Sequence, residues 1–154
     1  MQASTVGDWQ GVFIMSFQEK SAWAMILALT LAGAIYFSSV IHLSLEIGEI
    51  IPPLLPSLVI YTVIVVAMAA GSHIVIALLN PKEANAKLDE RERAIFDRAG
   101  HWSGVVLGFG VVMALGWYLF SYDGHLMFYA ILLTLMVAQL IEYFLRIAFY
   151  KRPF

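Results

Sequence analysis

Apolar residues in this chain fall into four long runs that are separated by polar breaks. The runs cover residues 22–45, 57–79, 102–120 and 126–148, and no charged residue lies in their central turns. A helix needs about 20 consecutive apolar residues to cross the hydrocarbon core of a bilayer. The pattern therefore predicts four membrane-spanning helices.

The breaks between the runs contain residues that end helices. Proline cannot continue a helix, and Pro52 and Pro56 lie between the first and second runs. An Asn-Pro pair ends the second run, and the turn sequence at 121–124 separates the third from the fourth. We therefore expect an all-α fold, in which an integral membrane four-helix bundle consists of two hairpins. A cytoplasmic helical segment within residues 80–101 joins the two hairpins.

The remaining division of the chain is simple. Residues 22–154 are expected to form a single transmembrane domain, and residues 1–21 an N-terminal segment in the cytoplasm or at the membrane interface. This segment lacks the basic start of a cleaved signal peptide. Met15 is an alternative start residue to Met1.

All nine lysines and arginines fall on one side of this four-span arrangement. One precedes the first run, five lie in the connector and three lie near the end of the chain, whereas the acidic residues Glu46, Glu49 and Asp123 lie in the opposite loops. Cytoplasmic segments of membrane proteins carry the excess of Lys and Arg. We therefore expect both termini and the connector in the cytoplasm.

Composition excludes several classes of protein. Apolar residues make up 61% of the chain and charged residues 13%, against roughly 25% charged residues in a soluble domain. The chain has no cysteine, which excludes disulfides, thiolate catalysis and Cys-based metal sites. A net charge of −2 without a basic patch argues against direct binding of nucleic acid.

Small residues recur on the predicted third helix. Gly100, Gly104 and Gly108 form a stripe at four-residue spacing. Because lipid tails are as apolar as leucine, membrane helices associate where small residues allow close packing. The stripe predicts one tight helix contact, either within the bundle or between two copies of the chain, and we expect a homo-oligomer or a larger assembly in the bilayer.

The segment before the third run has the charge pattern of a helix start. Asp89 is placed as an N-cap, and Glu92 follows three residues later, as in a capping box. The charges of Asp89, Glu90, Arg91, Glu92 and Arg93 are mixed, which favours contact with another protein over DNA or anionic lipid. Two interpretations stay open: a docking surface for a cytoplasmic partner, and a solvated face that sets topology.

These five residues carry a resemblance. Two apolar hairpins with the charged motif Asp89–Arg93 just before the third span resemble a group of small bacterial membrane proteins. The members of this group have no established activity and are often encoded beside a helix-turn-helix regulator. The resemblance covers most of residues 16–150, and this motif is its only sharp feature. It implies a bacterial inner membrane and contact between the motif and a cytoplasmic regulatory protein.

Ionisable residues inside a membrane are costly and are therefore functional candidates. His73 and Glu142 each lie six residues before the inner end of their runs, with Gln139 and Arg146 one turn from Glu142 and His101 at the inner mouth of the third run. The five are expected to form a buried polar cluster. It is either a proton relay or ligand site of a small transporter or channel, or a structural group in which Glu142 pairs with Arg146.

Metal and haem sites have weaker signals. His42, Glu46 and Glu49 share a helical face if the first helix continues that far, which makes them weak candidates for a divalent metal against the alternative of a solvated rim. Haem would need histidine pairs on facing helices, and the four histidines match only crudely in depth.

Catalysis has no clear signal. A hydrolase or transferase needs a nucleophile beside a base, and only Ser72 adjoins a histidine, on a neighbouring helical position that faces another way. We therefore expect a non-enzymatic membrane protein without a bound cofactor, which acts as an accessory or regulatory partner through its connector. A transporter using His73 and Glu142, and a haem or metal protein, are the alternatives.

Overall fold

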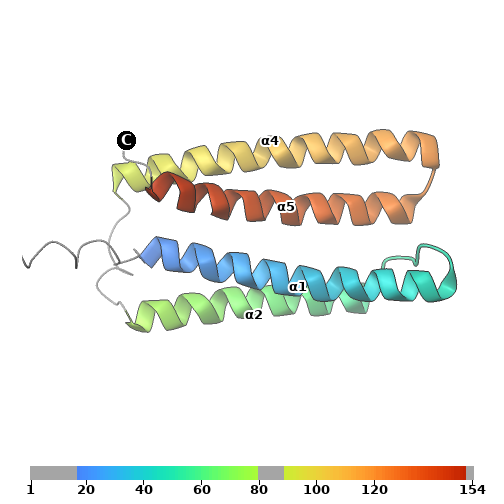
Figure 1. The fold of residues 1–154 in the computed structure, drawn as a ribbon, viewed down its shortest axis with the longest axis horizontal. Coiled ribbons are helices and arrows are strands. Elements are labelled where there is room, and N and C mark those ends of the chain that lie inside the picture. Colours follow the sequence, from blue (N-terminus) through green and yellow to red (C-terminus); the bar gives the residue numbers. More distant parts are fainter. Residues whose placement is uncertain (1–16, 80–88, 152–154) are drawn as a thin grey trace, which may run out of the picture.

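The computed structural model describes residues 17–79 and 89–151. These residues form four helices without any strand: α1 (Phe17–Ile47), α2 (Leu55–Leu79), α4 (Glu90–Ser121) and α5 (Gly124–Lys151) (Figure 1). Each of the four is long and apolar enough to cross a membrane. The all-α class and the four helices of membrane-crossing length are therefore confirmed.

The helices are longer than the apolar runs that predicted them. α1 begins at Phe17, inside the predicted N-terminal segment, because the residues before the run continue its helical hydrogen bonding. α4 begins at Glu90 and passes through Gly100 to Ser121, so the end of the predicted connector and the third span are one helix. Residues 1–16, with the alternative start Met15, and residues 80–88 of the connector lie outside the described residues.

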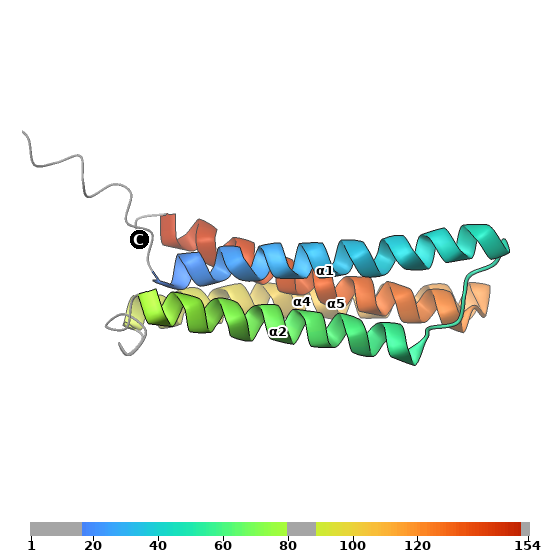
Figure 2. The ribbon, with the colours of Figure 1, turned by 90° about the horizontal axis from the view of Figure 1, so that it is seen from below.

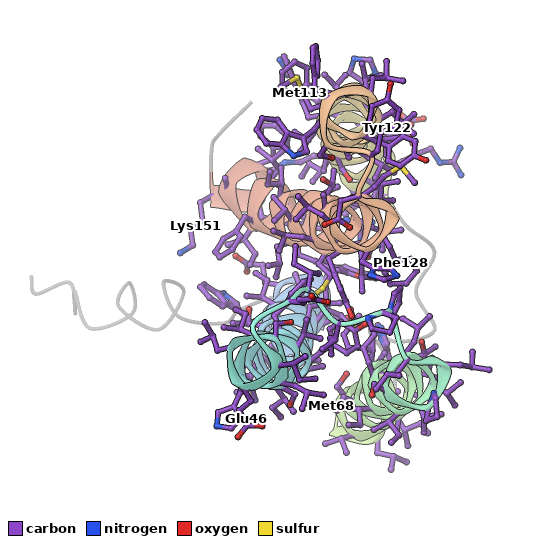
Figure 3. The ribbon with its side chains drawn as sticks, turned by 90° about the vertical axis from the view of Figure 1, so that its right-hand side faces the viewer. Glu46, Met68, Met113, Tyr122, Phe128 and Lys151 are labelled. Atoms are coloured by element: carbon purple, nitrogen blue, oxygen red, sulfur yellow. The ribbon has the colours of Figure 1, made fainter. Side chains whose placement is uncertain are left out.

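The helices lie side by side in an open arrangement (Figures 1 and 2). α5 and α1 pack against each other, α4 packs against α5, and α2 packs against α1. Seen from the end, α4 and α2 lie far apart (Figure 3). Within the described residues the helices pack in the order α2, α1, α5 and α4, and no core is shared by all four. A membrane permits this openness, because apolar side chains can face lipid.

Two buried clusters join the middle pair of helices. Near the start of α1, Ala22 and Ile26 pack with Ile147 of α5. Nearer the other end, Tyr36 of α1 packs with Tyr129 of α5 and with Ile51 of the 48–54 linker. These contacts fix the position of α5 against α1, and with it the position of α4.

The contact between α4 and α5 uses small residues, but not the predicted stripe. α4 buries Ile95, Ala99, Ser103 and Ala114. A Cβ added at Gly110 would overlap the side chain of Thr134 on α5, whereas a Cβ added at Gly104 or Gly108 would meet nothing within 4 Å. Gly104 and Gly108 thus face away from the other described helices and make no tight contact with them. Contact with a second copy stays a prediction.

The stripe that packs on α5 lies next to the predicted glycine stripe on α4, and the difference between them is geometric. Gly100 and Gly104 each follow a buried residue, Ala99 and Ser103, by one position. One position corresponds to about 100° of rotation around a helix of 3.6 residues per turn. Two neighbouring small-residue stripes therefore run along α4, and α5 packs against the one that contains Ala99 and Ser103.

Candidate functional site

The start of α4 is held by the predicted capping box. The side chain of Asp89 accepts a hydrogen bond from the Glu90 backbone N–H at 2.7 Å, and the Asp89 N–H donates to Glu92 Oε2 at 3.3 Å. The reciprocal pattern satisfies backbone donors that the first turn of a helix leaves unpaired. The capping role expected for Asp89 and Glu92 is confirmed.

Glu92 also ties α4 to the end of α5. Its other carboxylate oxygen, Oε1, accepts a hydrogen bond from the Tyr150 hydroxyl at 3.2 Å. One and two turns further along, Ile95 and Ala99 are completely buried. The first turns of α4 are therefore fixed in orientation against α5. The Tyr150 contact has no signal in the sequence, because Glu92 and Tyr150 lie 58 positions apart.

Arg146 of α5 forms the centre of a second contact in this region. It makes an ion pair with Glu142, as their i,i+4 spacing favours. Its guanidinium carbon lies 4.1 Å from the centroid of the Phe96 ring on α4 and 5.1 Å from that of Tyr143. Ion pairing and cation–π contact together hold the arginine between the two helices.

The opposite side of the same turns of α4 is charged and exposed. Glu90, Arg93 and Asp97 are spaced by three and four residues and so share one helical face. All three side chains are exposed, and no ion pair joins them to each other or to another described residue. We call these three residues the charged face of α4. Arg91 is exposed beside them.

The predicted buried polar cluster does not assemble. The structure brings Glu142 and Arg146 together, but His73 contacts Ser21 of α1, with 3.3 Å between its Nδ1 and the serine Oγ. His73, Gln139 and His101 are all exposed. The prediction compared depth along the helices, and depth says nothing about the face on which a side chain lies. Because α2 packs on α1 rather than on α5, the His73 side chain of α2 does not contact Glu142 of α5.

The three weak metal candidates His42, Glu46 and Glu49 are exposed at the end of α1. His42 Nδ1 lies 3.6 Å from Glu46 Oε1, and the two side chains are 76% and 60% exposed. α1 ends at Ile47, and Gly48 then adopts a positive φ of 80°, so Glu49 leaves the helical face that it was expected to share. In the part of the chain that the structure describes, no group of three His, Cys, Asp or Glu side chains is arranged to hold a metal.

The turn between α4 and α5 contacts the linker between α1 and α2. Asp123 Oδ1 accepts hydrogen bonds from the backbone N–H groups of His125 and Leu126, and so caps α5. The His125 ring nitrogen Nδ1 lies 3.3 Å from the Ile50 carbonyl oxygen in the 48–54 linker. Both residues thus have structural contacts.

The four histidines have separate neighbours. Beside the contacts already described for three of them, His101 packs its ring against that of Trp102, with 6.1 Å between the ring centroids. All four side chains are exposed. The histidine pairs considered for haem therefore do not face each other across a buried site.

These observations define a class: an all-α protein with four helices long and apolar enough to cross a membrane, within the residues described. Comparisons with protein-family models, with curated proteins and with solved structures find no match to this chain. The resemblance carried by Asp89–Arg93 stays a prediction.

Proposed function

We propose that this chain is an integral membrane protein that acts without catalysis as an accessory or regulatory partner of another protein. The partner binds the charged face of α4. Both termini and the start of α4 lie in the cytoplasm, in keeping with the one-sided distribution of Lys and Arg. The membrane is the bacterial inner membrane, as the resemblance implies.

One observation carries this proposal: a fixed helix presents exposed charges that have no ion pair in the described chain. The capping box and the Glu92–Tyr150 hydrogen bond hold the helix, so Glu90, Arg93 and Asp97 project in defined directions. Preorganised groups lose less entropy on binding than mobile ones. Asp89 and Glu92 serve the helix start. The docking role expected of the five motif residues is therefore proposed for Glu90 and Arg93, together with Asp97 on the same helical face.

The charge pattern selects the kind of partner. Two acids with a base between them suit a protein surface of complementary mixed charge, since such patterns determine partner choice and orientation. They do not suit nucleic acid, which requires a basic surface. A cytoplasmic regulatory protein fits both this pattern and the resemblance.

Neutralising the charged face tests the proposal. The triple variant Glu90→Gln, Arg93→Gln and Asp97→Asn removes the three charges, keeps the size of the two acidic side chains and leaves the capping box intact. The protein is extracted gently from its native membrane, and co-purifying proteins are quantified by mass spectrometry. We expect one stoichiometric protein with the unmodified chain and its loss with the triple variant.

A matched control changes exposed acids at the other end of the molecule. Glu46→Gln with Glu49→Gln should leave the captured protein unchanged, because these residues lie at the outer rim. Equal capture by the control and the triple variant would contradict the proposed docking face. An absorbance scan of the same sample tests the haem alternative, which predicts a Soret band.

A further inference from the structure

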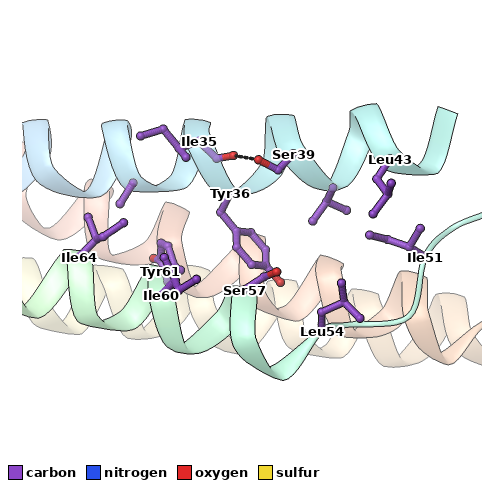
Figure 4. Close-up of a pocket in the computed structure, with 12 residues that line it drawn as sticks. Ile35, Tyr36, Ser39, Leu43, Ile51, Leu54, Ser57, Ile60, Tyr61 and Ile64 are labelled. Carbon is purple, nitrogen blue, oxygen red and sulfur yellow. Dashed lines mark hydrogen bonds between the residues drawn. The ribbon is translucent and has the colours of Figure 1, made fainter. Parts of the chain in front are cut away.

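An apolar pocket of about 220 Å³ lies between α1 and α2 (Figure 4). It occupies the part of these helices nearest the 48–54 linker, whose residue Ile51 closes one end. A cavity of about 150 Å³ lined by apolar side chains can bind benzene. The pocket is therefore large enough for a six-membered ring with substituents.

The lining of the pocket selects a neutral ligand. None of its twelve residues is charged, and its polar side-chain atoms are the hydroxyls of Tyr36, Ser39, Ser57 and Tyr61. Ile35 and Ile60, which also line it, are 59% and 60% exposed. A ligand can therefore enter from the side, between apolar residues that face lipid when the helices span a bilayer.

Tyr36 marks the polar end of the pocket. Its side chain reaches from α1 into the space between α1 and α2 (Figure 4). The residue is 5% exposed, and its hydroxyl is buried without a hydrogen-bond partner in the described chain. An unsatisfied buried hydroxyl is unfavourable, and a ligand oxygen that accepts its hydrogen bond would remove this cost.

Aromatic rings add a preference for a flat ligand. The rings of Tyr36 and Tyr61 lie 5.4 Å apart, centroid to centroid, at an angle of 53°. Aromatic groups prefer offset or edge contacts at such distances. A planar ring that enters from the lipid side can make contacts of this kind with the tyrosine rings.

We propose that this pocket binds a neutral ring compound with a carbonyl oxygen, the chemistry of a membrane quinone. The Tyr36 ring turns on binding, so that its hydroxyl, fully buried in the described chain, reaches the pocket and donates a hydrogen bond to the carbonyl. The apolar tail leaves between Ile35 and Ile60. Binding uses α1, α2 and their linker alone, so it is independent of the charged face of α4.

A phospholipid fits less well. No cationic residue lines the pocket to bind a phosphate.

Photoaffinity labelling tests this inference on the full chain in lipid nanodiscs. The probe is an azido derivative of decylubiquinone, and the labelled residues are mapped by mass spectrometry. We expect labels within residues 32–43 of α1 and residues 54–64 at the end of the linker and the start of α2. Decylubiquinone should suppress them, and decylbenzene, which has the same tail and no carbonyl, should not.

Two variants and a control separate the effect of the Tyr36 hydrogen bond from the effect of filling the pocket volume. Tyr36→Phe should weaken competition by decylubiquinone about fivefold, the effect of one neutral hydrogen bond. Ser57→Leu should reduce labelling by filling the pocket, and Tyr118→Phe on α4 should change nothing. Circular dichroism confirms that each variant is folded.

Several outcomes would overturn the inference. They are labels spread evenly over the described helices, absence of labels, equal competition by decylbenzene, and unchanged competition in Tyr36→Phe. Native mass spectrometry that finds a phospholipid in the pocket would assign it to bilayer lipid instead.

Discussion

Removing the Tyr150 hydroxyl should loosen the start of α4 while the capping box remains. Tyr150→Phe deletes only the hydrogen bond to Glu92 Oε1. Glu92→Ala deletes that bond and also the acceptor of the Asp89 N–H. The double variant of these two changes completes a cycle that isolates the interaction between α4 and α5.

The structure sets the expected magnitude. Hydrogen bonds to charged groups contribute roughly 1.5–3 kcal/mol, but 3.2 Å between the oxygens exceeds the usual range for this type of bond. The contact is also only partly buried. We therefore expect a coupling free energy of about 1 kcal/mol. Glu92→Ala alone should cost about 1 kcal/mol more than Tyr150→Phe, because loss of a helix cap has roughly this effect.

Equilibrium unfolding in mixed detergent micelles measures these free energies. Tyr118→Phe, on α4 and away from Glu92, is the control, and its effect should add to that of Glu92→Ala. Independent sites add within about 0.3–0.5 kcal/mol. A Glu92–Tyr150 coupling below this range would refute the view that the hydrogen bond orients the start of α4.

Three further predictions follow from the packing of α4 and α5. Gly110→Ala should destabilise the fold by about 1–3 kcal/mol in unfolding experiments, because the added methyl group overpacks against Thr134 of α5. Gly104→Ala should be neutral or stabilising in the same experiments. A change in oligomeric mass for Gly104→Ala alone would show that a second copy packs on the glycine stripe. Glu142→Leu should cost about 1–3 kcal/mol by leaving Arg146 unpaired between the helices, and the double change Glu142→Leu with Arg146→Leu should recover much of that loss in the same assay. Gln139→Leu should leave stability unchanged or raise it, because this exposed amide has no structural partner in the described residues; a loss above about 1 kcal/mol would contradict that placement.

Local and compositional features of the fold could be predicted from the sequence. The four helices followed from run length, because a bilayer sets the number of apolar residues that a helix needs. The capping box followed from Asp89 and Glu92, because both partners lie within one helical turn. The Glu142–Arg146 pair also depends on residues four positions apart on one helix.

Features that depend on the rotation and order of helices could not be predicted. Apolar residues surround each membrane helix, so the pattern does not reveal which face packs on protein and which on lipid. For this reason the sequence pattern does not show whether α5 packs on the stripe at Gly104 and Gly108 or on the one at Ala99 and Ser103. The Glu92–Tyr150 contact and the pocket beside Tyr36 join residues from different helices and have no sequence signature.

Site-specific photocrosslinking in native membranes tests the central claim most directly. A photoreactive phenylalanine derivative replaces Arg93 on the charged face or, as a control, Leu119, which is 67% exposed near the other end of α4. We predict one discrete protein adduct from position 93 and none from position 119. Identical protein adducts from both positions, or lipid adducts alone from position 93, would contradict a partner that binds the charged face of α4.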